Sequence, residues 1–139
     1  MSETKNIFLP NKEIFEYLKK YIEDNASVST WVGRNAVDNK NPMIVFEETR
    51  NELRKQSTTY DHTTRVMSYN INIYCSKLNN SYEIINELST LVIEVMQSEY
   101  HLSGGLIAIL PTFDDKNKIS YKATLRFVAN FQTNYNKIF

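Results

Sequence analysis

The sequence predicts an α+β domain in which two helices pack on one face of a four-stranded, mostly antiparallel sheet. The strongest observation is residues 121–131, where apolar side chains occupy every odd position and mostly polar ones every even position. Residues 67–75 repeat this alternation, which is typical of strands with one buried and one solvated face. Residues 14–22 and 84–96 instead carry apolar residues at helical spacing. The expected order of elements is therefore α-β-β-α-β-β.

The first helix is expected to begin at Asn11, a favourable N-cap, with Glu13 in its first turn. Asp24 and Asn25 are expected to end it. Residues 1–10 are expected to form an N-terminal arm. The apolar face of the helix consists of Ile14, Phe15, Leu18, Tyr21 and Ile22.

Residues 26–42 form the predicted connector, which closes with the turn-forming run Asp38–Pro42. Trp31 within it is expected to plug the edge of the core, and a contact with another subunit is the alternative. The next segment, Met43–Phe46, is continuously apolar, which favours a central strand.

Residues 47–65 are polar throughout, and we expect them to form a long loop that is mobile in a free subunit and ordered in an assembly. Arg50, Arg54 and Lys55 lie close together there. They are either solvated or form a contact site for another subunit or for passing DNA. Three nearby glutamates dilute their charge, which favours a protein contact over DNA.

The second helix is expected to start at Asn80, with Glu83 completing a capping box. Its apolar stripe should be the main cover of the core. The stripe consists of Ile84, Ile85, Leu88, Leu91, Val92, Val95 and Met96. Beneath it we expect the inner face of the sheet to bury Met67, Tyr69, Ile71, Ile73, Leu125, Phe127 and Phe131.

The third strand is expected to be Leu106–Leu110. Ser103–Gly105 is expected to interrupt regular secondary structure before it, and Pro111 is expected to end it. Because both of its faces are apolar, we expect it to be central. A turn at Asp114–Asn117 leads to the fourth strand, at about 119–131, and residues 133–139 form a tail.

Length and composition bound the class of protein. A chain of 139 residues predicts a single domain. Its 16 basic and 16 acidic residues balance, which argues against a dedicated nucleic-acid binder. The polar start predicts no signal peptide, and no apolar run approaches the roughly 20 residues of a membrane span. We expect a soluble protein that stays where it is made.

The sequence offers no recognisable catalytic or metal-binding group, so we expect neither an enzyme nor a cofactor. Cys75 lies on the apolar side of a strand and is expected to be a small buried residue. His62 and His101 lack further ligands at metal-binding spacing. Asp114 and Asp115 fit a turn better than a pair of catalytic carboxylates.

The order of elements resembles a family. A short helix leads through a connector with Trp31 to the strand that follows Pro42, and a polar segment leads to the alternating strand Tyr69–Tyr74. An amphipathic helix and a closing hairpin follow. This arrangement, over roughly residues 11–132, is similar to the tail-terminator and tail-completion (head–tail joining) proteins of tailed bacteriophages.

The resemblance implies a structural virion protein of the neck, assembled in the host cytoplasm. Such a protein forms a homo-oligomeric ring, typically a hexamer, that caps the tail tube, ends its polymerisation and joins the head connector. DNA would be met only in passage, and no membrane is involved. The alternative is a small cytoplasmic adaptor that binds another protein. Candidate contact residues are Phe8, Leu9, Trp31, Arg50, Arg54, Lys55, Ile138 and Phe139.

Overall fold

The computed structural model describes the backbone of residues 9–37, 40–57, 62–76, 80–113 and 119–134, and within these the side chains of 12–37, 40–50, 66–76, 80–111 and 120–129. The elements are α1 (Leu9–Asn25), β1 (Trp31–Gly33), β2 (Met43–Ser57), β3 (His62–Ser76), α2 (Ser81–Ile93), η1 (Glu94–Glu99), β4 (Ser103–Phe113) and β5 (Ile119–Asn134). The helix α2 continues directly into a π-helical turn, η1.

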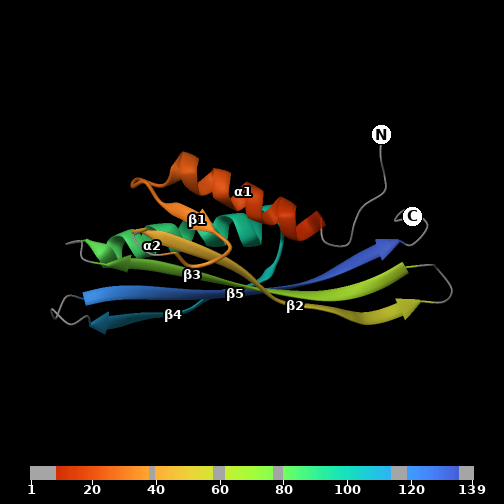
Figure 1. Cartoon of the computed structure of the whole chain (residues 1–139). Helices are drawn as coiled ribbons and strands as arrows, with labels where there is room; N and C mark the ends of the chain where they lie inside the picture. The colour runs from red at the N-terminus through yellow and green to blue at the C-terminus, as the bar shows by residue number, and fades with distance from the viewer. Residues whose placement is uncertain (1–8, 38–39, 58–61, 77–79, 114–118, 135–139) are drawn as a thin grey trace.

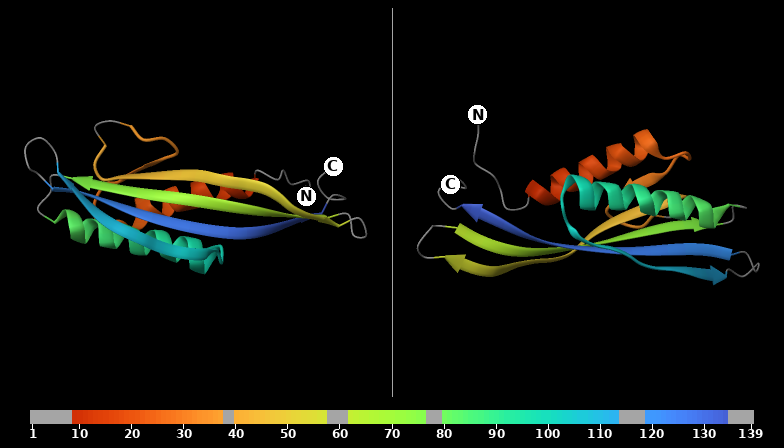
Figure 2. Two further views of the ribbon diagram at one scale, coloured as in Figure 1. Left: turned by 90° about the horizontal axis from the view of Figure 1, so that it is seen from below. Right: turned by 180° about the vertical axis from the view of Figure 1, so that it is seen from behind.

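The sheet has five strands in the order β1-β2-β3-β5-β4. β1 is parallel to β2 and the remaining pairs are antiparallel. Both helices lie on one face of the sheet, which confirms the predicted α+β class (Figure 1 and Figure 2). The predicted count of four strands is wrong, because β1 lies in the expected connector. A strand of three residues is too short to show an alternating pattern.

The core lies between the helices and the inner face of the sheet, as the alternation predicted. Six of the seven expected inner residues are at most 1% exposed, whereas the side chain of Phe131 lies outside the described residues. The stripe of α2 and η1 is buried above them, with Leu91 half-buried. Cys75 is also buried, as expected. The assignment of the two faces is therefore correct.

The prediction of a long loop at residues 47–65 is wrong. β2 continues to Ser57 and pairs with β3 from Met43↔Tyr74 to Ser57↔His62. This part of the sheet projects beyond α1 and α2, so neither helix covers it and its residues can be polar (Figure 1). Irregularities of register between Glu48 and Arg50 and between Leu53 and Lys55 also break the period of two. Polarity without alternation therefore concealed the continuation of β2 beyond Phe46 and the first residues of β3.

The third predicted strand also differs from expectation. β4 lies at an edge of the sheet rather than in its centre, and it runs through Pro111 to Phe113. Proline is acceptable in an edge strand, where one side of the backbone needs no ladder partner. The apolar run gave the wrong position because many of its side chains are exposed.

The first residues of the two helices agree in part with the predicted ones. α1 begins at Leu9, two residues before the expected N-cap Asn11. α2 begins directly after Asn80, as predicted, but the Asn80 side chain makes no capping hydrogen bond. The Asn80 carbonyl accepts the Ile84 N–H at 3.0 Å, which is the first hydrogen bond of the helix. The position of the cap was therefore right and the expected capping box was wrong.

Candidate functional site

The most exposed apolar surface of the sheet lies along β4. Leu106, Ile107 and Leu110 are 40%, 59% and 58% exposed, and Val128 on the adjacent β5 is 37% exposed. We call these four residues the apolar edge; the register places Leu106 on the face that carries the helices, and Leu110 and Val128 on the opposite face. No charged residue occurs between Ser103 and Phe113. Leucine and isoleucine side chains in contact with water at a sheet edge are a liability for an isolated protein. The apolar edge is therefore a candidate contact surface.

The position of β4 depends on a close approach at Gly104. Gly104 has φ +135°, and a Cβ there would lie 2.9 Å from the Cα of Phe127 and would also collide with the Arg126 carbonyl oxygen. The Gln97 side chain in η1 donates a hydrogen bond to the Gly104 carbonyl. The start of β4 is thus held by β5 on one side and by η1 on the other.

A change of register shapes the middle of β4. Leu106 pairs with Leu125, but the next pair is Ala108 with Thr124, so Ile107 is an extra residue. A bulge of this kind, together with Pro111, limits how regularly another strand can pair with this edge. Contacts of the apolar edge would therefore depend on side-chain burial more than on an extended backbone ladder.

The other side of the sheet ends in β1 and β2. β1 pairs with β2 at Met43, Ile44 and Val45. The segment of β2 from 47 to 55 carries six charged residues, and we call it the charged edge. Charged side chains on an edge strand discourage association with another strand. The charged residues are Glu47, Glu48, Arg50, Glu52, Arg54 and Lys55.

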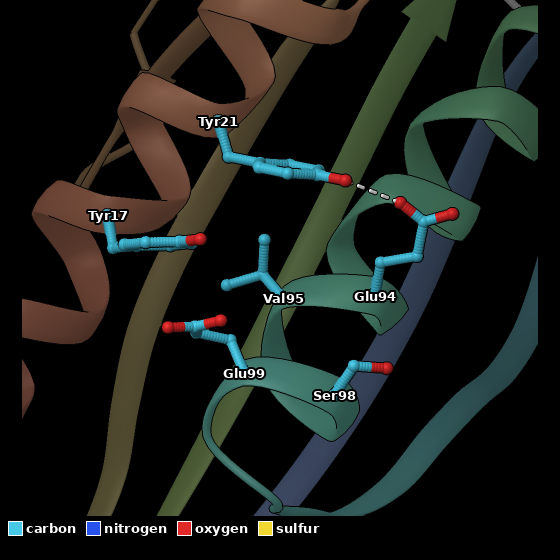
Figure 3. A pocket seen from close by; sticks show the side chains of 6 residues that line it. All are labelled: Tyr17, Tyr21, Glu94, Val95, Ser98 and Glu99. Carbon is cyan, nitrogen blue, oxygen red and sulfur yellow. Dashed lines mark hydrogen bonds between the residues drawn. The ribbon is translucent and has the colours of Figure 1, made fainter.

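A second candidate surface is a groove of about 280 Å³ between α1 and η1 (Figure 3). The Tyr21 hydroxyl donates a hydrogen bond to Glu94 Oε2 at 2.7 Å across it. This hydrogen bond to a carboxylate raises the pKa of Tyr21 above 10.0. We call it the aromatic groove. Its lining consists of Tyr17, Tyr21, Glu94, Val95, Ser98 and Glu99.

The contact residues expected from the sequence do not form one site. Trp31 is half-buried in β1, and its indole ring lies so close to Gly33 that a Cβ there would collide with it. Arg50 is exposed on β2. It lies about 20 Å along that strand from Met43, the residue that pairs with Trp31. Arg54 and Lys55 follow on β2, and Leu9 opens α1, but their side chains lie outside the described part of the chain. Phe8, Ile138 and Phe139 lie outside the described residues altogether.

Sequence reasoning missed both candidate surfaces for identifiable reasons. The residues of β4 were recognised as apolar but were placed in the centre of the sheet. The aromatic groove joins α1 and η1, and its residues Tyr21 and Glu94 are 73 positions apart in the chain. Its one local signal is Tyr17 and Tyr21 at a spacing of four, which places both rings on one side of a helix.

No group of three or more histidine, cysteine, aspartate or glutamate side chains in the described residues could hold a metal ion. No helix in the described part of the chain has the length and apolar character needed to cross a membrane.

Comparison with known proteins adds no family to these observations. No protein-family model matches the chain, and no curated protein matches it either.

Proposed function

We propose that this chain is a structural assembly protein that associates with copies of itself into a ring, and that the ring caps a bacteriophage tail tube. The observation that carries the proposal is the apolar edge, where Ile107 and Leu110 are 59% and 58% exposed in the single chain. The resemblance of element order to tail-terminator proteins supplies the biological setting. The ring would consist of about six copies, as the family resemblance suggests.

The apolar edge supports self-association because burying it removes leucine, isoleucine and valine side chains from water. A closed ring requires two different, complementary surfaces on each subunit. The second surface is proposed to lie at the opposite end of the sheet, near β1. There Trp31 is half-buried and Val37 is 40% exposed. In a ring, the apolar edge of one copy would cover this area of the next.

The proposed ring would act by differential recognition. One face binds the end of the tail tube, and the other face does not reproduce the surface on which tube subunits polymerise, so growth ends. The head connector would bind this second face, and the partners are therefore the tube protein and the connector. Assembly would take place in the host cytoplasm, and the product would be part of the virion neck.

The mass of the purified chain in solution tests the self-association step. The wild type is expected to form a ring of about six copies, and Ile107→Lys with Leu110→Lys is expected to give monomers because two buried charges at the contact cost more than burial gains. Asn86→Lys with Thr90→Lys is the matched control, since it adds the same two charges at exposed positions of α2. A wild-type chain that stays monomeric both alone and with tail tubes would contradict the proposal.

The phage-level test is electron microscopy of tails made without this protein. Overlong or headless tails are expected, and tails of normal length joined to heads would overturn the functional assignment. A truncation can examine the C-terminal tail separately. β5 runs to Asn134, so a deletion should begin at residue 135 to keep the strand whole. We expect this deletion to weaken the ring and to leave the fold intact.

A second candidate function is a small protein-binding adaptor. The aromatic groove favours it, because a hollow lined by tyrosines and glutamates suits recognition of a protein side chain. A chain that remains monomeric at high concentration and on tail tubes, but binds a cellular protein through the groove, would support the adaptor instead.

A further inference from the structure

We propose that the aromatic groove binds the guanidinium group of an arginine side chain presented by a partner protein. This inference is independent of the apolar edge and of ring formation. The groove combines two features that guanidinium groups recognise, namely aromatic ring faces and carboxylates, at a size that suits a single side chain.

The aromatic part of the groove is held in place by its neighbours. The rings of Tyr17 and Tyr21 lie nearly parallel, at an interplanar angle of 14° with centroids 6.2 Å apart. The ring of Tyr100 meets Tyr17 edge-on at 5.7 Å and 87°. Figure 3 shows Tyr17 and Tyr21 projecting from α1 toward the residues of η1. The ring faces are therefore ordered before any ligand arrives, which lowers the entropic cost of binding.

The charged part of the groove comes from η1. In the described part of the chain, neither Glu94 nor Glu99 forms an ion pair, and no basic residue lines the groove. Glu94 Oε2 accepts the Tyr21 hydroxyl, so Oε1 remains able to accept a hydrogen bond from a ligand. The Coulombic effect of Glu99 contributes, after burial and Glu13, to the raised pKa of Tyr100. The groove thus presents negative charge that the described protein groups do not neutralise.

The π-helical turn is what brings these carboxylates together. The Tyr100 N–H donates to the Val95 carbonyl at 3.2 Å, a spacing of five residues instead of the four of an α-helix. This wider turn places Glu94, Ser98 and Glu99 around one opening, opposite the tyrosines (Figure 3). Single π-helical turns occur frequently at functional sites, where they re-aim side chains.

Size and chemistry favour arginine over other occupants. The volume of about 280 Å³ is at the lower end of the range of small-molecule pockets, which begins near 300 Å³. A guanidinium is planar, stacks on an aromatic face and donates in parallel to a carboxylate, whereas a lysine ammonium is a compact, strongly hydrated charge. The ligand is therefore expected to be an arginine at an exposed position of the partner.

The experiment uses the full chain labelled with 3-fluorotyrosine and observed by fluorine NMR, which remains usable if the chain forms a large ring. The resonances of Tyr17 and Tyr21 are assigned with Tyr17→Phe and Tyr21→Phe. The probe is N-acetyl-arginine methylamide, and N-acetyl-citrulline methylamide is the uncharged isostere. Saturable shifts of the Tyr17 and Tyr21 resonances with the arginine probe are expected, with binding about tenfold weaker for citrulline.

Two variants sharpen the result. Glu94→Gln combined with Glu99→Gln should weaken binding of the arginine probe at least about tenfold, since both charge-assisted contacts are removed. Glu23→Gln, an exposed position of α1 outside the groove, should leave binding unchanged. Equal binding of both probes, unchanged binding by the double variant, or no shift of either resonance would overturn the proposal. None of these outcomes depends on whether the chain forms a ring.

Discussion

The two edges of this sheet are chemically opposite. Along β2, the charged edge carries six charged residues between 47 and 55. Along β4, the strand from Ser103 to Phe113 carries no charge, and Leu106, Ile107 and Leu110 are exposed. A protein that is to remain monomeric protects its edges with charges, prolines or bulges. This chain places charges on one edge, whereas β4 combines Pro111 and a bulge at Ile107 with exposed hydrophobic side chains, which makes it a candidate contact surface.

The largest expected effect concerns the residue that supports β4 from the inner face. Phe127 is fully buried and pairs with Gly104, so Phe127→Ala should destabilise the fold by about 3–5 kcal/mol through the cavity it leaves. Its neighbour Val128 belongs to the apolar edge and is 37% exposed. Val128→Ala should cost less than about 1 kcal/mol. Denaturant unfolding measures both, and similar losses would mean that the two faces are assigned incorrectly.

The alternation of residues along β3 and β5 allowed the inner face to be predicted residue by residue. That success has a simple cause, because one face of these strands is covered by helices within the same chain and the other is not. The helices were predicted for the same reason, since their apolar stripes are buried by the sheet. Where burial occurs inside one chain, polarity reports position.

The two edges were mispredicted because that relation fails there. The polar residues after Phe46 continue as a strand that neither α1 nor α2 covers, so polarity indicated a loop where a strand exists. The apolar residues of β4 indicated a central strand, but they lie at an edge. Both errors come from the premise that apolar residues are buried, and polar residues exposed, within a single chain. If the apolar edge is covered by a second copy, the sequence of β4 does report burial, but burial in the assembly.

The second-largest expected effect on stability concerns the contact that holds β4 against β5. Gly104→Ala should destabilise the fold by about 1–3 kcal/mol, because alanine is strained at φ +135° and its Cβ would collide with the backbone of β5. Gly105→Ala is the matched control. A Cβ at Gly105 would meet Gln97 Nε2 at 3.7 Å, an ordinary contact. Thermal unfolding compares the two, and an equal loss would show that the close approach at Gly104 does not position the strand.

A smaller effect on stability is expected at the apolar edge itself. Ile107→Lys should change the free energy of unfolding of the monomer by no more than about 0.5 kcal/mol, because the side chain is 59% exposed. The same substitution should abolish or weaken assembly. Unfolding is therefore measured at protein concentrations low enough to populate monomers, and mass is measured at high concentration. A large loss of monomer stability would indicate that Ile107 serves the fold rather than a contact.

The smallest effect concerns Cys75, on the central strand β3 between the two edges. Burial raises the pKa of this thiol above its usual 9.0, so the folded chain holds the proton more tightly than the unfolded chain. The resulting stability is fully present below the unfolded pKa and is lost as the pH rises through the folded pKa. We expect the free energy of unfolding to fall as the pH rises from about 8 to about 10, less steeply in Cys75→Ala. Burial raises the pKa of Tyr69 as well, but its loss of stability begins above the usual tyrosine pKa of 10.0. If the free energy of unfolding falls equally with pH in wild type and Cys75→Ala, the thiol is not shielded from water, and the centre of the sheet is less well buried than the structure indicates.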